Sequence, residues 1–206
     1  NLSAEEAKKL YRNLRSGAES GWDFSARWLK DPNKLESIQI TDIAPVDLNA
    51  LVYGLASLLV KYYNDLDNSN KSAHYSNLAE KLKTTINKYC WNEEVGYYFD
   101  YITTTNKKST IYTMAGAVPL FTEMATSSQA DAIAITLQEK MLLKGGFVST
   151  LIKTDLQWDS PNGWAPLQWF GVKGLLNYGK KNLAIKAMQC WINTMEAHFT
   201  KTKMLM

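Results

Sequence analysis

Residues 45–90 read PVDLNALVYGLASLLVKYYNDLDNSNKSAHYSNLAEKLKTTINKYC. Apolar side chains recur in each half of this segment at the spacing of one face of an α-helix. In the first half they are Leu48, Leu51, Val52, Leu55, Leu58, Leu59 and Tyr62. In the second half they are Tyr75, Leu78, Ala79, Leu82, Ile86 and Tyr89. Because the polar segment 65–71 lies between them, the pattern predicts an antiparallel helical hairpin, with the apolar face of the first helix buried.

Further helices are expected on both sides of this hairpin. Ser3 followed by two glutamates is a helix start signal and predicts a helix from Ala4 to Leu14. The other helices are predicted at about 113–124, 128–142, 164–178 and 181–201, with glycines as breaks. Residues 96–102 are aromatic and β-branched, which favours a short extended stretch. About seven helices with almost no strand predict an all-α fold, and they exclude the α/β-hydrolase and dinucleotide-binding folds.

Composition and charge exclude several classes of function. The chain has 23 basic and 20 acidic side chains, with a formal net charge of +3, and they are interspersed along the sequence. This pattern is typical of a solvated surface, so no nucleic-acid partner is expected. No apolar run reaches the length of a transmembrane segment. With only two cysteines and two histidines, neither a metal site nor a cofactor is expected.

Carboxylates that follow tryptophans are the best candidates for chemistry. The two histidines lie on predicted helices, so no Ser-His-Asp or Cys-His nucleophile system is indicated. Asp23 follows Trp22, and Asp159 follows Trp158, each in a predicted loop. A carboxyl group enclosed by aromatic rings is partly desolvated, which raises its pKa and keeps it protonated near neutral pH, as a glycosidase acid requires. The alternative interpretation is that these aspartates cap helices.

Three stretches of the chain resemble the trehalase family. Residues 157–166 read QWDSPNGWAP, which is similar to a signature of that family. Residues 19–28 read ESGWDFSARW and resemble its other diagnostic stretch, while residues 45–49 read PVDLN and resemble a segment between the two. The resemblance extends over essentially the whole chain. It implies part of an (α/α)6 toroid, a ring of helical hairpins, and an inverting hydrolase that splits trehalose into two glucose molecules without a cofactor.

The resemblance also implies roles for individual residues. Asp23 would be the general acid that protonates the glycosidic oxygen. The expected substrate-binding residues are Gly21, Trp22, Gln157, Trp158 and Asp159. The backbone of the glycine would lie against the sugar, the tryptophans would stack on its faces, and the glutamine and aspartate would form hydrogen bonds with its hydroxyl groups. The tryptophans could instead only support the wall of the site.

Two parts of the family pattern are missing from residues 1–206. Trehalases have a long N-terminal part with another signature and several sugar-binding arginines, and none of it precedes Asn1. The family's general base is a glutamate that follows the helix matching Lys181 to Lys203, and the chain ends at Met206. We therefore expect residues 1–206 to be an incomplete catalytic domain. The chain alone is expected to be inactive and to self-associate through its exposed inner apolar surface.

Two other functions stay open from the sequence. A non-catalytic helical scaffold or sugar-binding module would account for the helix pairs, but it gives no reason for the QWDSPNGWAP stretch. A related toroid α-glucosidase, similar to glucoamylase, would keep the fold and change the substrate. The compartment is undetermined, and only the resemblance favours a periplasmic or secreted protein.

Overall fold

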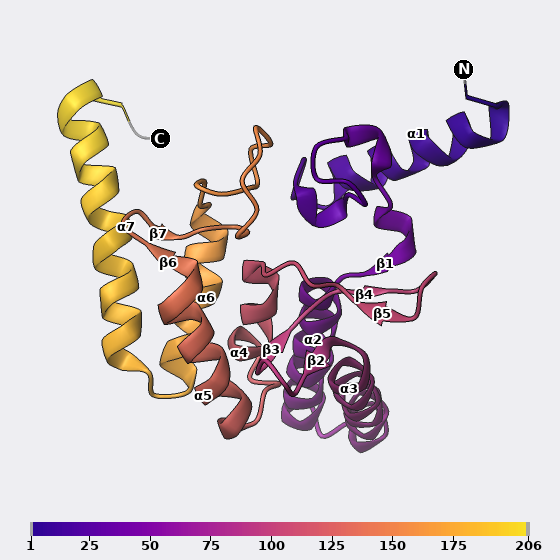
Figure 1. Ribbon diagram of the computed structural model, residues 1–206. Helices are drawn as coiled ribbons and strands as arrows, with labels where there is room; N and C mark the ends of the chain where they lie inside the picture. The colour runs from indigo at the N-terminus through magenta and orange to yellow at the C-terminus, as the bar shows by residue number, and fades with distance from the viewer. Residues whose placement is uncertain (1, 205–206) are drawn as a thin grey trace.

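A computed structural model describes residues 2–204 and consists mainly of α-helices (Figure 1). The helices are α1 (Ala4–Glu19), α2 (Val46–Asp65), α3 (Ser69–Cys90), α4 (Val118–Phe121), α5 (Ser127–Thr136), α6 (Ala165–Asn177) and α7 (Lys181–Thr202). The strands have two residues each: β1 (Ile43–Ala44), β2 (Trp91–Asn92), β3 (Tyr97–Tyr98), β4 (Tyr101–Ile102), β5 (Lys107–Lys108), β6 (Leu142–Leu143) and β7 (Gly146–Phe147). The predicted all-α class is confirmed. None of the helices in residues 2–204 is both long and apolar enough to cross a membrane.

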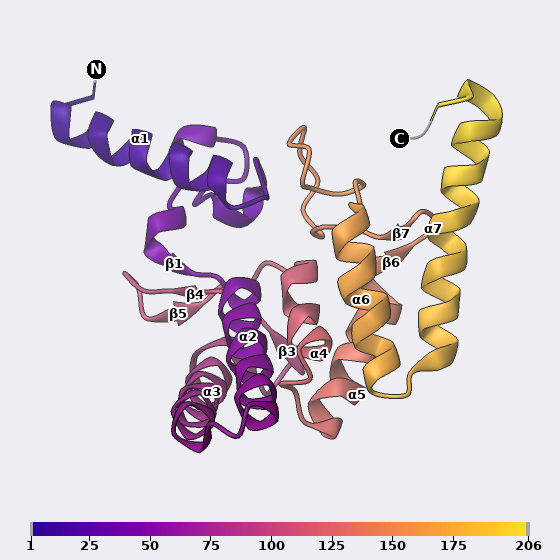
Figure 2. The ribbon, with the colours of Figure 1, turned by 180° about the vertical axis from the view of Figure 1, so that it is seen from behind.

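Two long helical hairpins lie on either side of the short helix α4. Figures 1 and 2 show α2 and α3 on one side of α4, and α6 and α7 on the other, with α5 on the side of α6. The turn between α2 and α3 has Asp67 at φ 53°, and the turn between α6 and α7 has Gly179 at φ 71°. Both turns place a residue in the left-handed region, which ends one helix and lets the next return beside it. The hairpin predicted from residues 45–90 is confirmed.

Short antiparallel strands fix the loops between the helices. Strand β4 pairs with β1 and with β5, so the chain entering α2 is joined to the loop that follows α3. The pairs β2–β3 and β6–β7 are separate hairpins. The extended stretch predicted at 96–102 is confirmed, since it contains β3 and β4.

The core lies where α4 packs between α2 and α6. Its largest fully buried side chains include Tyr97, Met114, Leu120, Phe147 and Leu175. Glycines allow the closest approaches: a Cβ atom at Gly174 would lie 2.7 Å from the Cβ of Leu120. Helices therefore pack at this point with almost no side chain between their backbones.

Three sequence-based expectations need correction. The helix predicted at 113–124 is a 3-10 turn, Met114–Ala117, followed by the four residues of α4. Pro119 is tolerated only in the first turn of an α-helix, so α4 starts just before it. Glu123 has a left-handed backbone, with φ 58°, so the helix cannot continue past it. Helix α1 continues past Leu14 to Glu19, since Gly17 is buried against Phe24 and Ile38.

The third correction concerns the apolar face of α2, which was expected to be buried. The exposed residues of this face are Leu48, Leu51, Val52, Leu55, Leu58 and Tyr62. Helix α2 instead buries Val46, Ala50 and Ala56. Small side chains allow α3 and α4 to pack closely on that side, and no segment of residues 2–204 covers the larger ones. We call the five residues 48, 51, 55, 58 and 62 the α2 stripe.

Candidate active site

The loop that follows α1 carries Asp23 and is fixed by its own hydrogen bonds. Gly21, at φ 76°, adopts the left-handed conformation that turns the chain away from the helix. The backbone N–H of Trp22 donates to the hydroxyl of Ser20 over 3.0 Å, and the indole N–H of Trp28 donates to the carbonyl of Trp22 over 3.1 Å. The loop is therefore closed on itself around Asp23.

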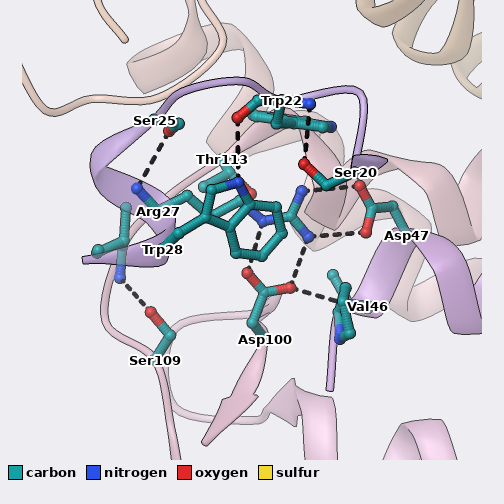
Figure 3. A network of polar contacts seen from close by, with 12 residues as sticks. Ser20, Trp22, Ser25, Arg27, Trp28, Val46, Asp47, Asp100, Ser109 and Thr113 are labelled. Carbon is teal, nitrogen blue, oxygen red and sulfur yellow. Dashed lines mark hydrogen bonds and ion pairs between the residues drawn. The ribbon is translucent and has the colours of Figure 1, made fainter. Parts of the chain in front are cut away.

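A buried arginine anchors this loop to the rest of the fold (Figure 3). Arg27 donates through Nε and Nη2 to the carboxylate of Asp100, over 2.7 and 2.8 Å. Nη1 and Nη2 donate to the carboxylate of Asp47, over 2.8 and 2.7 Å. Its guanidinium carbon also lies 4.5 Å from the ring centre of Trp22 and 4.2 Å from that of Trp28. Two paired carboxylates and two aromatic rings thus surround one buried charge, the condition under which a buried ion is tolerated.

The electrostatics of this cluster favour its charged form. Burial opposes the ionisation of Arg27. The charges of Asp100 and Asp47 outweigh this effect and raise the pKa of the guanidinium. Burial likewise opposes the ionisation of Asp47, and the charge of Arg27 outweighs it, so the pKa of Asp47 lies below its ordinary value. Asp100 also accepts the backbone N–H of Val46 over 2.9 Å, which satisfies a free donor at the start of α2.

The second tryptophan-aspartate loop packs directly on the first. Asp159 is completely buried, and its carboxylate accepts hydrogen bonds from the Ser25 hydroxyl, the Ala26 backbone N–H and the hydroxyls of Thr150 and Thr154. These donors occupy both of its oxygens. Asp159 is therefore placed to hold the two loops together. Ser25 caps the short 3-10 helix that starts at Ala26, and the helix after Asp159 has no side-chain cap, so the capping interpretation does not hold for Asp159. It does not face an open space.

Tryptophan rings from the two loops form one row. The rings of Trp22 and Trp158 lie 5.2 Å apart between centres, with a tilt of 32°. Trp158 in turn stacks on Trp164 at 4.4 Å and 9°. The indole N–H of Trp158 is buried and has no hydrogen-bond partner among the described residues. A buried donor without a partner is rare in folded proteins.

A cleft of about 390 Å³ opens beside this row. The residues that line it include Gly21, Trp22, Trp28, Asp47, Leu48, Trp158 and Phe170. An apolar, aromatic wall with two carboxylates, Glu19 and Asp47, is suited to a sugar, whose faces are apolar and whose edge carries hydroxyl groups.

The predicted site residues divide into two groups. Gly21, Trp22 and Trp158 line the cleft. Asp23, Gln157 and Asp159 lie outside that lining, and the Gln157 amide donates to the backbone carbonyl of Asp23. The Asp23 side chain is partly exposed, and within residues 2–204 its carboxyl group forms no hydrogen bond or ion pair. The carboxyl therefore has no partner among the described residues, and it caps no helix there.

Sequence reasoning missed the cluster of Arg27, Asp47 and Asp100. Two of these residues lie within quoted stretches, since Arg27 belongs to ESGWDFSARW and Asp47 to PVDLN. An arginine flanked by tryptophans was a usable signal, because a buried guanidinium needs rings and carboxylates around it. No local pattern marks Asp100, which lies 73 residues from Arg27 in the sequence.

Comparison with known proteins identifies the family. A sequence profile of trehalases matches residues 1–206. The chain belongs to the trehalase family. It is 39% identical over 199 residues to the periplasmic trehalase of Salmonella typhimurium, covering 97% of this chain and 35% of that protein. It is 42% identical over 179 residues to the periplasmic trehalase of Citrobacter koseri, covering 87% of this chain and 31% of that protein. The chain thus spans about a third of the length of these trehalases.

Solved structures show the fold to which the chain contributes. The neutral trehalase of Saccharomyces cerevisiae matches with a TM-score of 0.86 and 24% identity, over 98% of this chain and 39% of that one. A mannosylglycerate hydrolase from Thermus thermophilus matches with a TM-score of 0.66 and 19% identity, over 75% of this chain and 38% of that one. The described helices are therefore part of an (α/α)6 trehalase toroid, and the family is one of glycoside hydrolases.

Proposed function

We propose that this chain supplies the acid-bearing part of a trehalase active site, with Asp23 as the general acid. The observation that carries the proposal is the unpaired carboxyl of Asp23, directly after the cleft-lining Trp22, in a chain of the trehalase family. The product would be two molecules of glucose from each trehalose. Membership of this family makes a non-catalytic scaffold the weaker candidate.

The chemistry is a single displacement with inversion. The protonated carboxyl of Asp23 gives its hydrogen to the bridging oxygen while the bond from that oxygen to the anomeric carbon breaks. A water molecule attacks the same carbon from the opposite face, and a base takes its proton. In inverting glycosidases the acid and the base stand roughly 6.5 to 9.5 Å apart, which leaves room for that water.

Sugar binding would use the cleft lined by Trp22, the residue before Asp23. Trp22 and Trp158 present flat apolar surfaces, and Gly21 exposes backbone with no side chain above it. Gln157 would act mainly by holding the backbone of Asp23, to which its amide donates. Asp159 would act by joining the two loops, because protein donors occupy both of its oxygens.

The chain alone is proposed to be inactive. Asp23 cannot protonate the leaving oxygen and deprotonate the attacking water in the same step, so a second carboxylate is required. By family resemblance that base is a glutamate outside residues 1–206. We therefore expect activity only in the intact protein, meaning a polypeptide that contains this chain together with the rest of a trehalase domain.

The test compares Asp23→Asn with wild type in the intact protein. Loss of a general acid lowers kcat for trehalose by roughly 100- to 10,000-fold. The same variant should hydrolyse α-glucosyl fluoride nearly as fast as wild type, because fluoride leaves without protonation. Asp155→Asn, on an exposed residue of the second loop, is the matched control and should retain full activity.

Three further measurements test the stereochemistry, the substrate and the location of the base. Proton NMR at early times should show one α- and one β-glucose per trehalose, as inversion requires. Maltose should not be hydrolysed, which separates a trehalase from a glucoamylase-like enzyme. Glucose release from trehalose by the isolated 206-residue chain would contradict the proposal that the general base lies outside residues 1–206. An unchanged kcat in Asp23→Asn would contradict the role of Asp23 as the acid.

A further inference from the structure

Two carboxylates line the cleft, Glu19 and Asp47, and sequence reasoning assigned a role to neither. Glu19 is exposed and pairs with Arg15, which leaves Asp47 as the partly buried carboxylate of the cleft. Asp47 lies in the first turn of α2, and its side chain is 15% exposed. Its Oδ1 accepts two hydrogen bonds, from Arg27 Nη2 at 2.7 Å and from the Leu48 backbone N–H at 2.9 Å. Its Oδ2 accepts one, from Arg27 Nη1 at 2.8 Å. Since a carboxylate oxygen can accept two hydrogen bonds, Oδ2 retains one acceptor position.

The position of this carboxylate is fixed before any ligand binds. Arg27 holds it through two parallel hydrogen bonds, and Asp100 holds Arg27 in the same way from the other side (Figure 3). The rings of Trp22 and Trp28 cover the guanidinium. Side chains held in this way have little freedom left to lose when a ligand binds.

A second polar group of the cleft lacks a partner. The buried indole N–H of Trp158, which lines the same cleft, has no hydrogen-bond acceptor among the described residues. Trp158 is only 8% exposed, so an unpaired donor there is costly. The free acceptor position at Asp47 lies in a cleft walled by aromatic rings. A hydroxyl group of a sugar can donate to it.

We propose that Asp47 is a substrate-binding residue whose Oδ2 accepts a hydrogen bond from a hydroxyl group of trehalose, and that Arg27 is the positioning residue that aims it. This inference rests on the proposed trehalase function. Because an ionised carboxylate only accepts, the position selects a hydroxyl and rejects a deoxy sugar.

Asp47→Asn is a sharp test because the amide has one predictable orientation. Its oxygen is favoured at the Oδ1 position, where two donors converge, and this places the NH2 group at the Oδ2 position. The substitution therefore turns the proposed acceptor into a donor. Asp100→Asn is chemically matched: Oδ1 of Asp100 also accepts two donors, and its Oδ2 also accepts one from Arg27, but Asp100 does not line the cleft.

The experiment measures the Kd for trehalose by calorimetry in the intact protein, with Asp23→Asn in every variant so that the sugar is not consumed. Asp47→Asn should raise the Kd by roughly 10- to 100-fold, as expected for a lost hydrogen bond to a charged group. Asp100→Asn should raise it by a clearly smaller factor, because it removes support from Arg27 but no contact with the sugar, although thermal denaturation should show a similar loss of stability in both. Equal effects of the two variants on the Kd would overturn the inference and leave a structural role only.

Two further measurements keep the outcome decisive. If Asp47→Asn does not fold, a crystal structure of the intact Asp23→Asn protein with trehalose decides: a sugar oxygen within about 3.2 Å of Asp47 Oδ2 supports the inference, and none within about 4 Å overturns it. Failure of the proposed function is seen separately, since a wild-type intact protein would then release no glucose from trehalose.

Discussion

The carboxylate of Asp159 accepts the hydroxyl hydrogen of Ser25 over 2.7 Å, across 134 residues of sequence. Both groups are completely buried, so no water replaces this bond. The same carboxylate accepts the backbone N–H of Ala26 over 2.9 Å. The loop that carries Asp23 is therefore held by a residue of the other tryptophan-aspartate loop.

Asp159→Asn should loosen this junction. The asparagine amide replaces one acceptor oxygen with an NH2 group that faces other donors. Buried hydrogen bonds to charged groups contribute about 2 to 3 kcal/mol to stability. We expect the free energy of unfolding, from urea denaturation, to fall by that amount. Asp155→Asn, four residues earlier and exposed, should leave it unchanged. Equal stability of the two variants would show that the carboxylate network contributes nothing.

Local periodicity predicted much of this fold. The α2–α3 hairpin, α6 and α7 follow from apolar spacing and glycine breaks, signals that lie within each helix. What the sequence could not predict depends on contacts between distant segments. Helix α1 runs past Gly17 because Phe24 and Ile38 pack on it, and the α2 stripe is exposed because no described segment covers it. The Arg27 cluster needs Asp100 from another loop, and such long-range pairs leave no local pattern.

The candidate site was predicted to a similar extent. Motif resemblance placed both tryptophan-aspartate loops in the site, and they do pack together through Trp22 and Trp158. The resemblance could not distinguish a carboxyl group without hydrogen-bond donors from one whose two oxygens both accept hydrogen bonds, because Asp23 and Asp159 follow tryptophans in the same way. Their difference arises from the hydroxyl and backbone donors that the fold brings to Asp159 alone.

Gly116→Ala should be strongly destabilising. A Cβ atom there would lie 2.5 Å from the backbone oxygen of Tyr98 and would overlap the ring of Tyr97. Neither neighbour can move easily in a packed core, so we expect a loss of about 2 kcal/mol or more in the free energy of unfolding. Gly145→Ala is the matched control, because its Cβ would meet nothing closer than 3.6 Å and should change stability little. A similar loss in both variants would contradict this packing argument.

The two free thiols should differ in reactivity. Cys90 is buried, and burial, with a smaller effect of the Asp100 charge, raises its pKa to about 12. Almost no thiolate then forms near pH 8, and the thiolate is the species that reacts. A thiol-disulfide reagent should modify Cys190 rapidly and Cys90 only after unfolding. Cys190→Ser should abolish the fast phase, and a fast phase that persists in this variant would contradict the burial of Cys90.

Acid should weaken the Arg27 cluster. The pKa of Asp47 in the folded protein lies below its ordinary value of 3.8, because the attraction of Arg27 outweighs the effect of burial. A lowered folded pKa contributes stability that is complete above the unfolded value and is lost as the pH falls through the folded one. Between these two values the free energy of unfolding should fall by up to about 1.4 kcal/mol per pH unit from this group.

The measurement is urea denaturation from neutral pH to about pH 3. Asp47→Asn should be less stable than wild type at neutral pH and should lose less on acidification, since one titrating group is gone. Asp100 faces the same guanidinium and still pairs with Arg27 in this variant. Parallel curves for the two proteins would mean that Asp47 does not stabilise the fold through its charge.

The isolated chain should self-associate through the α2 stripe. Its five residues, 48, 51, 55, 58 and 62, are 37% to 61% exposed and recur along one face of α2. Monomeric proteins rarely leave such a continuous apolar face in water, and a second copy of the chain can cover it. Light scattering at high concentration should give a mass above 23.3 kDa, and the double variant Leu55→Glu with Leu58→Glu should return it toward that value.

Ile135→Glu, on an exposed isoleucine of α5, should leave the association intact. A wild-type chain that stays at 23.3 kDa over the whole concentration range would show that exposure of the stripe does not drive association.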